Sequence, residues 1–267
     1  MAAGLPRACS MKLELTGKRV LVTGSSKGIG RAIATRFLDE GSSVVITSRG
    51  EENLTQLERH LKREYGDSKV LAKMCDCSDL DSLESLKKKI NKEWHGLDIV
   101  IANAGNGKSV PDPLPSKKQW AQTWKSNFET ALNTSRVFIP SLRESKGCLL
   151  FISSIAAMEA FGAPVDYSTS KAAVIALAKN LSRKLAQEIR INTLAPGNIY
   201  FHGGSWDEKM QENSEHVKAI IENSVPMKRF GTLDEISDAA LFLCSNRASF
   251  INGSTLVVDG GQTVGVL

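Results

Sequence analysis

Seven short apolar runs recur along the chain, each separated from the next by a longer and more polar stretch. The runs are rich in β-branched residues and apolar at consecutive positions. This pattern is typical of central parallel strands, because both faces of such strands are buried. The predicted strands span residues 19–23, 44–47, 70–74, 97–102, 149–153, 191–194 and 256–258.

The stretches between these runs carry apolar residues every three to four positions, which is the spacing of an amphipathic helix. The clearest stripes are Ile29, Ile33 and Phe37; Leu54, Leu57, Leu61 and Tyr65; and Leu83, Leu86, Ile90 and Trp94. Ser78 is placed to cap the third of these helices, while Gly66 and Gly96 are placed to end the second and the third. The longest predicted helices span residues 116–144 and 165–188.

Predicted strands and helices alternate along the chain, with no linker and no repeat between them. With right-handed crossovers, this order predicts an α/β fold. We expect a single doubly wound, Rossmann-type domain, in which helices cover both faces of a seven-stranded, mostly parallel sheet. Residues 13–267 are assigned to this domain, and residues 1–12 to a flexible N-terminal extension.

Composition and charge narrow the possible partners and locations. The 267 residues are 42% hydrophobic, and the net charge is only +5. The lysines are dispersed over helix faces, so we expect no nucleic-acid partner. No apolar run reaches the length of about 18 residues that a membrane span requires, and residues 1–10 lack the apolar core of a secretory signal. These features predict a cytoplasmic protein with no membrane partner.

The chain has five cysteines: Cys9, Cys75, Cys77, Cys148 and Cys244. Their odd number and their spacing fit neither a disulfide framework nor a zinc site. Cys75 and Cys77 share one side of a predicted strand, but no second pair of ligands follows. None of the histidines belongs to an H-E-x-x-H motif. We therefore expect reduced thiols and no bound metal.

A glycine-rich turn joins the first predicted strand to the first predicted helix. Its sequence, residues 24–30, reads G-S-S-K-G-I-G and includes Ser26 and Ile29. Gly24, Gly28 and Gly30 let backbone approach a pyrophosphate closely, and the helix N-terminus offers free N–H groups. The strand–turn–helix context therefore favours a dinucleotide site, although such a turn can also be purely structural.

A hydroxyl, a phenol and an amine converge further along the chain. Tyr167 and Lys171 are four residues apart and lie on the same face of a helix, while Ser154 follows the strand at 149–153. A strand end and the next helix bring the three side chains to one point. The alternatives are a Tyr–Lys pair on a solvated helix face and a Ser154 that only caps the next segment, with Ser153 as a neighbouring candidate.

These motifs, with Asn103-Ala104-Gly105 between them, resemble the short-chain dehydrogenase/reductase family over about residues 13–263. The closing stretch, residues 225–263, is similar to the β-ketoacyl carrier-protein reductase branch. The resemblance implies an oxidoreductase that interconverts a carbonyl and an alcohol by hydride transfer. It also implies a homo-oligomer, a tetramer or a dimer, in which the two longest helices pair between subunits. The alternative is that their second apolar face packs internally.

The charge around the glycine turn indicates which dinucleotide binds. An NAD site usually has a carboxylate at the end of the second strand, but here Ser48 and Arg49 stand there with no acid before Glu51. Lys27 adds a second cation within the turn. These residues suit a 2′-phosphate, so NADP(H) is the expected cofactor. The alternative is that both cations are ordinary surface residues.

Several further cofactor contacts follow from the resemblance. It implies that Asp76 accepts from the adenine amino group, with Cys77 beside it, although Asp76 could instead cap the following helix. It also places Asn103, Ala104 and Gly105 against the adenine-side ribose. At the nicotinamide it implies the turn of Pro196 and Gly197, together with the backbone of Ile199.

The resemblance also assigns catalytic roles. Tyr167 is the general acid/base, Ser154 orients the substrate oxygen, and Asn127 holds a water that links Lys171 to solvent. An independent physical argument supports the Tyr–Lys pair. A cation about 5 Å away, at an effective dielectric constant near 20, stabilises a phenolate by about 3 kcal/mol. We therefore expect Lys171 to lower the pKa of Tyr167.

The chain departs from the family pattern after the sixth strand. Two residues beyond Ile199 the family usually has Thr, whereas this chain has Phe201. The resemblance implies that residues 198–227 close over the substrate. We name Phe201, His202 and Trp206 as candidate substrate contacts, the alternative being aromatic anchors of a loop.

Two other functions remain possible for such a fold. An epimerase or dehydratase would carry a G-x-x-G-x-x-G turn and a larger C-terminal domain, and this chain has neither. A non-catalytic NADP-binding sensor or scaffold would be marked by loss of the Tyr or the Lys, and both are present. The substrate stays open among 3-oxoacyl, sugar-derived and other small carbonyl compounds.

Overall fold

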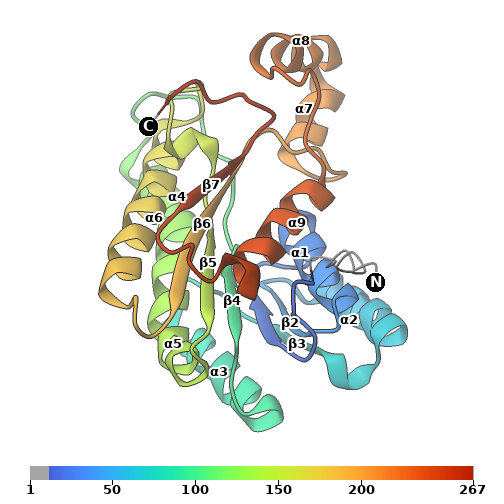
Figure 1. Ribbon diagram of the computed structural model, residues 1–267. Coiled ribbons are helices and arrows are strands. Elements are labelled where there is room, and N and C mark those ends of the chain that lie inside the picture. The colour runs from blue at the N-terminus through green and yellow to red at the C-terminus, as the bar shows by residue number, and fades with distance from the viewer. Residues whose placement is uncertain (1–11, 267) are drawn as a thin grey trace, which may run out of the picture.

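A parallel sheet runs through the middle of the molecule in the order β3-β2-β1-β4-β5-β6-β7 (Figure 1). This computed structural model describes residues 12–266, so the predicted extension lies outside the described residues except for Lys12. All neighbouring strands pair in parallel, which confirms the predicted fold class. The strands are β1 (Arg19–Val22), β2 (Ser43–Ser48), β3 (Val70–Met74), β4 (Ile99–Ala102), β5 (Cys148–Ile152), β6 (Arg190–Pro196) and β7 (Thr255–Val258).

Helices cover both faces of the sheet (Figure 1). Successive residues of one strand point to opposite faces, so Val20 and Val22 join one apolar layer while Leu21 joins the other. The first layer packs under α1 (Gly28–Asp39), α2 (Glu51–Tyr65) and α9 (Leu233–Cys244). The second packs under α3 (Leu80–Trp94), α5 (Thr130–Ser145) and α6 (Val165–Lys184). This is why the strands read as apolar at consecutive positions.

The longest predicted helix is interrupted in the structure. Residues 116–144 form α4 (Lys117–Trp124) and α5, joined by a π-helical turn at Lys125–Glu129. The second long helix, α6, ends at Lys184, four residues before the predicted end. Ser78 does not cap α3. Asp79 does so by accepting from the backbone N–H groups of Asp81 and Ser82.

Two helices stand beyond the carboxyl ends of the strands, at the top of Figure 1. They are α7 (Ser205–Glu212) and α8 (Ser214–Ser224), and they lie within the segment 198–227 that the sequence left without helices. Both are short, so each offers too few turns for hydrophobic periodicity to find it. Within residues 12–266, no helix has the length and apolar character to cross a membrane.

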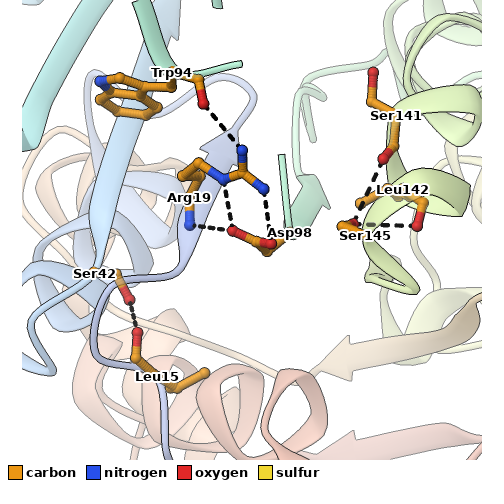
Figure 2. A network of polar contacts seen from close by, with 8 residues as sticks. All are labelled: Leu15, Arg19, Ser42, Trp94, Asp98, Ser141, Leu142 and Ser145. Atoms are coloured by element: carbon orange, nitrogen blue, oxygen red, sulfur yellow. Dashed lines mark hydrogen bonds and ion pairs between the residues drawn. The ribbon is translucent and has the colours of Figure 1, made fainter. Parts of the chain in front are cut away.

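At the amino ends of the strands, an ion pair joins β1 to the residue that precedes β4 (Figure 2). Arg19, at the start of β1, donates from Nε and Nη2 to the two carboxylate oxygens of Asp98, at 2.9 and 3.0 Å. Arg19 Nη1 also donates to the Trp94 carbonyl at 3.0 Å. Burial acts to raise the pKa of Asp98, but the hydrogen bonds and charge of Arg19 outweigh it and leave that pKa below its ordinary value. The pair therefore stabilises the ionised carboxylate.

Candidate active site

A cleft of about 710 Å³ opens at the carboxyl ends of the strands, where the sheet order reverses between β1 and β4. Ligands of open α/β sheets bind in such a crevice. Most of the site residues predicted from the sequence line it: Gly24, Ser26, Lys27, Gly28, Ile29, Gly30, Ser48, Arg49, Asp76, Cys77, Asn103, Ala104, Gly105, Asn127, Tyr167, Lys171 and Phe201. The structure therefore brings residues that are far apart in the chain, from Gly24 to Phe201, to one place.

The glycine turn forms one wall of this cleft. Gly24 and Gly28 have φ angles of 62° and 58°, in the left-handed region that favours glycine. A Cβ on Gly30 would lie 2.4 Å from Asn103 Nδ2 and 2.5 Å from the Gly24 carbonyl oxygen. The turn is thus too tight for other residues at this position. No side chain caps the start of α1, so its first N–H groups remain available to an anion.

Asn103 holds the turn from the neighbouring strand. Its Nδ2 donates to the carbonyl oxygens of Thr23 and Gly24, at 2.9 and 3.0 Å. The backbone N–H groups of Asn103 and Ala104 both donate to Thr23 Oγ1, at 3.0 Å. These bonds fix the end of β4 to the end of β1 and hold the glycine turn between them.

Cations and one carboxylate surround the far end of the cleft. Asp76 Oδ1 accepts from the N–H and Oγ of Ser78 at 2.9 and 2.7 Å. Burial acts to raise the pKa of Asp76, but these bonds and the charges of Arg49 and Lys125 together lower it. Asp76 therefore lines the cleft and also holds the turn before α3. Lys125, which sequence reasoning missed, also lines the cleft and lies with Arg49 near Asp76. Lys27 lines the cleft too, but its Nζ donates to the Gly203 carbonyl at 3.4 Å.

The phenol and the two serines lie where β5 meets α6. Ser154 lies near enough to the Tyr167 phenol to lower its pKa, and its Oγ accepts from the N–H of Ala156 at 3.2 Å. The neighbouring Ser153 is buried, and its Oγ donates to the Lys171 carbonyl at 2.9 Å. The two serines therefore have different tasks: Ser153 fixes α6 to the strand end, and Ser154 faces the phenol.

Lys171 and Asn127 complete this end of the cleft. The Lys171 side chain is buried, and its Nζ donates to the Ile152 carbonyl at 3.0 Å. Asn127 lies in the π-helical turn. Its Oδ1 accepts from the backbone N–H of Asn106 at 3.0 Å, and its Nδ2 donates to the Asn106 carbonyl at 2.9 Å. A Cβ on Gly105 would lie 2.9 Å from Asn127 Oδ1 and 3.2 Å from Lys171 Nζ. The amide and the amine thus flank Gly105.

The expected lowering of the Tyr167 pKa is not found. Burial raises the pKa of Tyr167 above its ordinary value, and the hydrogen bond of Ser154 offsets only part of this. Burial also lowers the pKa of Lys171 to about 8. The simple charge argument failed because both groups lose water, which disfavours the charged form of each. Phenol and ammonium are therefore the forms present at neutral pH.

The loop after β6 contributes less to the cleft than the resemblance implied. Pro196 ends β6, Gly197 donates to the Val258 carbonyl at 2.9 Å, and Ile199 forms a bridge to Gly231. All three lie outside the residues that line the cleft. Phe201 does line it, with its ring against the glycine turn. A Cβ on Gly28 would come within 2.7 Å of the Phe201 ring.

The other two candidate substrate residues lie elsewhere. His202 is exposed and its Nδ1 pairs with Asp207 Oδ2 at 3.1 Å. Trp206 packs edge-on against Phe230 at 5.5 Å between ring centroids, with the Lys209 ammonium 4.6 Å from its ring. Neither lines the cleft. Trp206 packs against neighbouring side chains as a loop anchor would, whereas His202 stays exposed and contacts only Asp207 among these residues.

Buried carboxylates fix the two loops that border the cleft. Asp166, in the first turn of α6, accepts from Ser109 Oγ at 2.6 and 2.7 Å and is fully buried. Asp207 accepts from Tyr200 Oη at 2.6 Å and from the Gly203 N–H at 2.8 Å. Sequence reasoning missed both. The sequence did contain a signal for Asp166. It lies in the first turn of the helix beside Tyr167, where a carboxylate interacts favourably with the helix dipole.

Comparisons with known proteins match nearly the whole chain. The family model described as "Enoyl-(Acyl carrier protein) reductase" matches residues 24–263. "Short-chain dehydrogenase/reductase SDRA" of Arabidopsis thaliana is 34% identical over 251 residues, covering 93% of this chain and 96% of the relative. "3-oxoacyl-[acyl-carrier-protein] reductase FabG" of Aquifex aeolicus (strain VF5) is 32% identical, covering 94% of this chain and all of the relative.

A solved structure is similar over the same length. It is L-sorbose reductase from Gluconobacter frateurii, complexed with NADPH and L-sorbose, with a TM-score of 0.89 and 28% sequence identity. The alignment covers 96% of this chain and 100% of that one. Fold, site and sequence together define a nicotinamide-cofactor oxidoreductase class. This chain belongs to the short-chain dehydrogenase/reductase family, in its 3-oxoacyl carrier-protein reductase-like branch.

Proposed function

We propose that this protein is an NADP(H)-dependent oxidoreductase that interconverts a ketone or aldehyde and an alcohol. The observation that carries this proposal is the cleft itself. A glycine turn with free helix N–H groups lines it, as do Tyr167 and Lys171, while Ser154 lies next to Tyr167 but outside the lining residues. A reaction of this class needs both, because the cofactor and the substrate oxygen must be held within reach of each other.

The residues of the cleft fit a phosphorylated dinucleotide. Gly28, Ile29 and Gly30 open α1 with free N–H groups, which suits a pyrophosphate. Lys27 and Arg49, with Ser48, are assigned to the 2′-phosphate, and Lys125 adds positive charge at the same end. Asp76 and Cys77 are assigned to the adenine, and Asn103, Ala104 and Gly105 to its ribose. Pro196, Gly197 and Ile199 remain proposed contacts of the nicotinamide end.

The chain's own groups handle the substrate oxygen and its proton. NADP(H), when bound, supplies or accepts the hydride. Ser154 and Tyr167 hold the oxygen by hydrogen bonds, which polarises the carbonyl. Because burial raises the pKa of Tyr167, the phenol keeps its proton at neutral pH and donates it to the oxygen that forms during reduction.

Two further residues support that proton transfer. The Lys171 ammonium, fixed to the Ile152 carbonyl, provides positive charge beside the phenol after it has given up its proton. Asn127 borders Lys171 across Gly105, and we assign it to the path by which a proton returns from solvent. Reduction is the direction that this protonation state favours.

The printed names of the relatives leave the substrate class open. They include reductases of 3-oxoacyl carrier protein and of L-sorbose. For this chain we therefore propose a small carbonyl compound, without a choice between 3-oxoacyl and sugar-derived ones. A homotetramer or dimer and a cytoplasmic location stay predictions from the sequence.

A binding titration followed by an activity panel tests this proposal. NADPH and NADH are titrated by quenching of protein fluorescence, and carbonyl compounds are then screened for consumption of NADPH. Arg49→Ala and Lys27→Ala each remove one charge-assisted contact of about 1.5–3 kcal/mol, so each should lower the preference for NADPH by about tenfold to a hundredfold. His202→Ala is the control and should leave the preference unchanged. Equal affinity of the unmutated chain for NADPH and NADH would contradict the cofactor assignment.

A further inference from the structure

A buried carboxylate lies directly beside Tyr167, and the proton transfer described above does not use it. Asp166 is the second residue of α6, and none of its surface is exposed. Such a carboxylate needs hydrogen-bond donors, because an unpaired buried charge is costly. The Ser109 hydroxyl lies 2.7 Å from Oδ1 and 2.6 Å from Oδ2, and the Tyr167 N–H donates to Oδ1 at 2.9 Å. Asp166 therefore joins the start of the helix that carries Tyr167 to Ser109.

Ser109 ends a short segment of the cleft wall, residues 106–109, which we call the wall segment. The first two residues of the wall segment line the cleft. The residue before it, Gly105, lies between the Asn127 amide and the Lys171 amine. The wall segment therefore starts at the candidate catalytic end of the cleft.

Buried side chains fix the wall segment at both of its ends. At the start, Asn127 accepts from the Asn106 N–H at 3.0 Å and donates to the Asn106 carbonyl at 2.9 Å. Within the segment, the Lys108 N–H donates to Asn106 Oδ1 at 2.9 Å, which forms a tight turn. At the end, Ser109 is bound to Asp166. The turn is thus held on both sides.

A further link of the wall segment is exposed. Lys108 Nζ pairs with Glu208 Oε1, on α7, at 2.7 Å, and 63% and 48% of the two side chains are exposed. Ion pairs this exposed contribute little, because water screens them. A hydroxyl bound to a buried carboxylate contributes more, since the charged acceptor strengthens the bond and no water replaces it. The bond of Ser109 to Asp166 is therefore the stronger of the two links.

We propose that Asp166 and Ser109 are a positioning pair that holds the wall segment in register with Tyr167 for the carbonyl substrate. The role rests on the proposed function and deepens it. Asp166 also binds the Tyr167 N–H, so the wall segment and the phenol share one support. Neither Asp166 nor Ser109 lines the cleft, so both act through the residues that do. A misplacement of about 1 Å at a reaction site can lower the rate by about a hundredfold.

Steady-state kinetics of two variants test the pair. Ser109→Ala removes the hydroxyl, so kcat/KM for the carbonyl compound should fall by about tenfold to a hundredfold. Its affinity for NADPH should stay within about twofold, since the phosphates are assigned to the glycine turn. Asp166→Asn should keep kcat/KM within about threefold, because the carboxamide accepts from Ser109 and Tyr167 through Oδ1 and donates to Ser109 Oγ through Nδ2. An equal fall in both variants would overturn the proposal, since charge rather than position would then decide the rate.

Two control variants separate positioning from a general loss of stability. Ser42→Ala removes a buried hydroxyl that donates to the Leu15 carbonyl at 2.8 Å, far from the cleft lining (Figure 2). It should lower stability to urea and leave kcat/KM unchanged. Lys108→Ala breaks only the exposed pair with Glu208, so its kcat/KM should stay within about threefold. A loss in either control as large as that in Ser109→Ala would contradict the positioning role.

Hydrogen exchange measured by mass spectrometry tests the pair without any turnover. The N–H groups of Asn106 and Lys108 are protected by the bonds that form the turn. A peptide covering residues 105–112 should exchange about tenfold or more faster in Ser109→Ala, and at the unmutated rate in Asp166→Asn and Ser42→Ala. Unchanged exchange in Ser109→Ala would overturn the proposal. If exchange is faster there but the unmutated protein reduces no carbonyl compound, the pair holds the wall segment and it is the proposed function that fails.

Discussion

At the scale of single residues, Phe201 is the departure with the clearest consequence. Its ring lies against Gly28 at the glycine turn, where the resemblance to the family leads us to expect Thr. The proposed cofactor would bring its phosphates to the same turn. Phe201 therefore has to move when the cofactor binds, and the lost packing counts against the affinity.

Phe201→Thr should bind NADPH about threefold to tenfold more tightly, because no ring has to leave the glycine turn. Equilibrium titration measures this. His202→Ala is the neighbouring control, since His202 is exposed and does not line the cleft, and its affinity should stay that of the unmutated protein. Weaker binding by Phe201→Thr would mean that the ring instead contacts the bound cofactor.

The pH dependence of reduction should reveal Lys171. Burial lowers its pKa to about 8, so the ammonium is present below that pH and is lost as the pH rises through it. Without this charge the phenolate of Tyr167 is harder to form, and kcat/KM for the carbonyl should fall above about pH 8. Lys171→Arg keeps its charge over the whole range, so its residual activity should show no fall at this pH. A profile in the unmutated enzyme that is flat to pH 10 would contradict this role.

At this scale the sequence predicted which side chains gather but not their electrostatics. The four-residue interval between Tyr167 and Lys171 and the spacing of the glycines are local patterns. Local patterns can be read from the sequence, so these residues were predicted correctly to line one site. The pKa values depend on how much water each group loses, which only the packing of β5 against α6 determines.

At the scale of elements, the π-helical turn at Lys125–Glu129 positions Asn127. Such turns occur frequently at functional sites, since one extra residue re-aims the side chains of a helix. Here the turn also directs Lys125 into the cleft. Hydrophobic periodicity could not predict it, because a single π-turn barely changes the apolar stripe of a helix almost thirty residues long.

Asn127→Ala should remove both bonds to Asn106 and the bond to the Thr123 carbonyl. Because Asn127 is buried, we expect a loss of about 1–3 kcal/mol in the free energy of unfolding, together with a lower kcat. Asn133→Ala, on α5, is the control, since it loses a bond to the Ser78 carbonyl outside the candidate catalytic end. Urea unfolding and steady-state kinetics separate the two. An equal loss of kcat in both variants would mean that Asn127 has only a structural role.

At the scale of the whole molecule, the two ends of the strands have different roles. The cleft lies at the carboxyl ends, whereas the ion pair of Arg19 and Asp98 stabilises the amino ends (Figure 2). The parallel sheet with helices on both faces followed from the sequence, because runs apolar on both faces require helices on both sides. The helices α7 and α8 did not, since their placement depends on tertiary contacts such as those of Asp207 with Tyr200 and Gly203.

Asp98→Asn should lower the free energy of unfolding by about 1–2 kcal/mol at pH 7, a value discounted because the pair is partly exposed. The folded-state pKa of Asp98 is lowered, so its stabilisation is present above the unfolded value of about 3.9 and is lost as the pH falls through the folded value. The difference between the variant and the unmutated protein should therefore shrink below about pH 4. Asp238→Asn breaks the more exposed pair with Arg36 and is the control, with an expected effect of about 0–1 kcal/mol. A difference that stays constant down to pH 2 would contradict the ion-pair account.

The most direct test of the central claim is the activity of Tyr167→Phe with NADPH and a carbonyl compound that the unmutated protein reduces. The variant keeps the ring and the packing and lacks only the hydroxyl. We predict that NADPH binds with unchanged affinity while kcat falls by about 10²–10⁴, the contribution of a positioned acid. Turnover within about twofold of the unmutated rate, with NADPH still bound, would contradict Tyr167 as the proton donor.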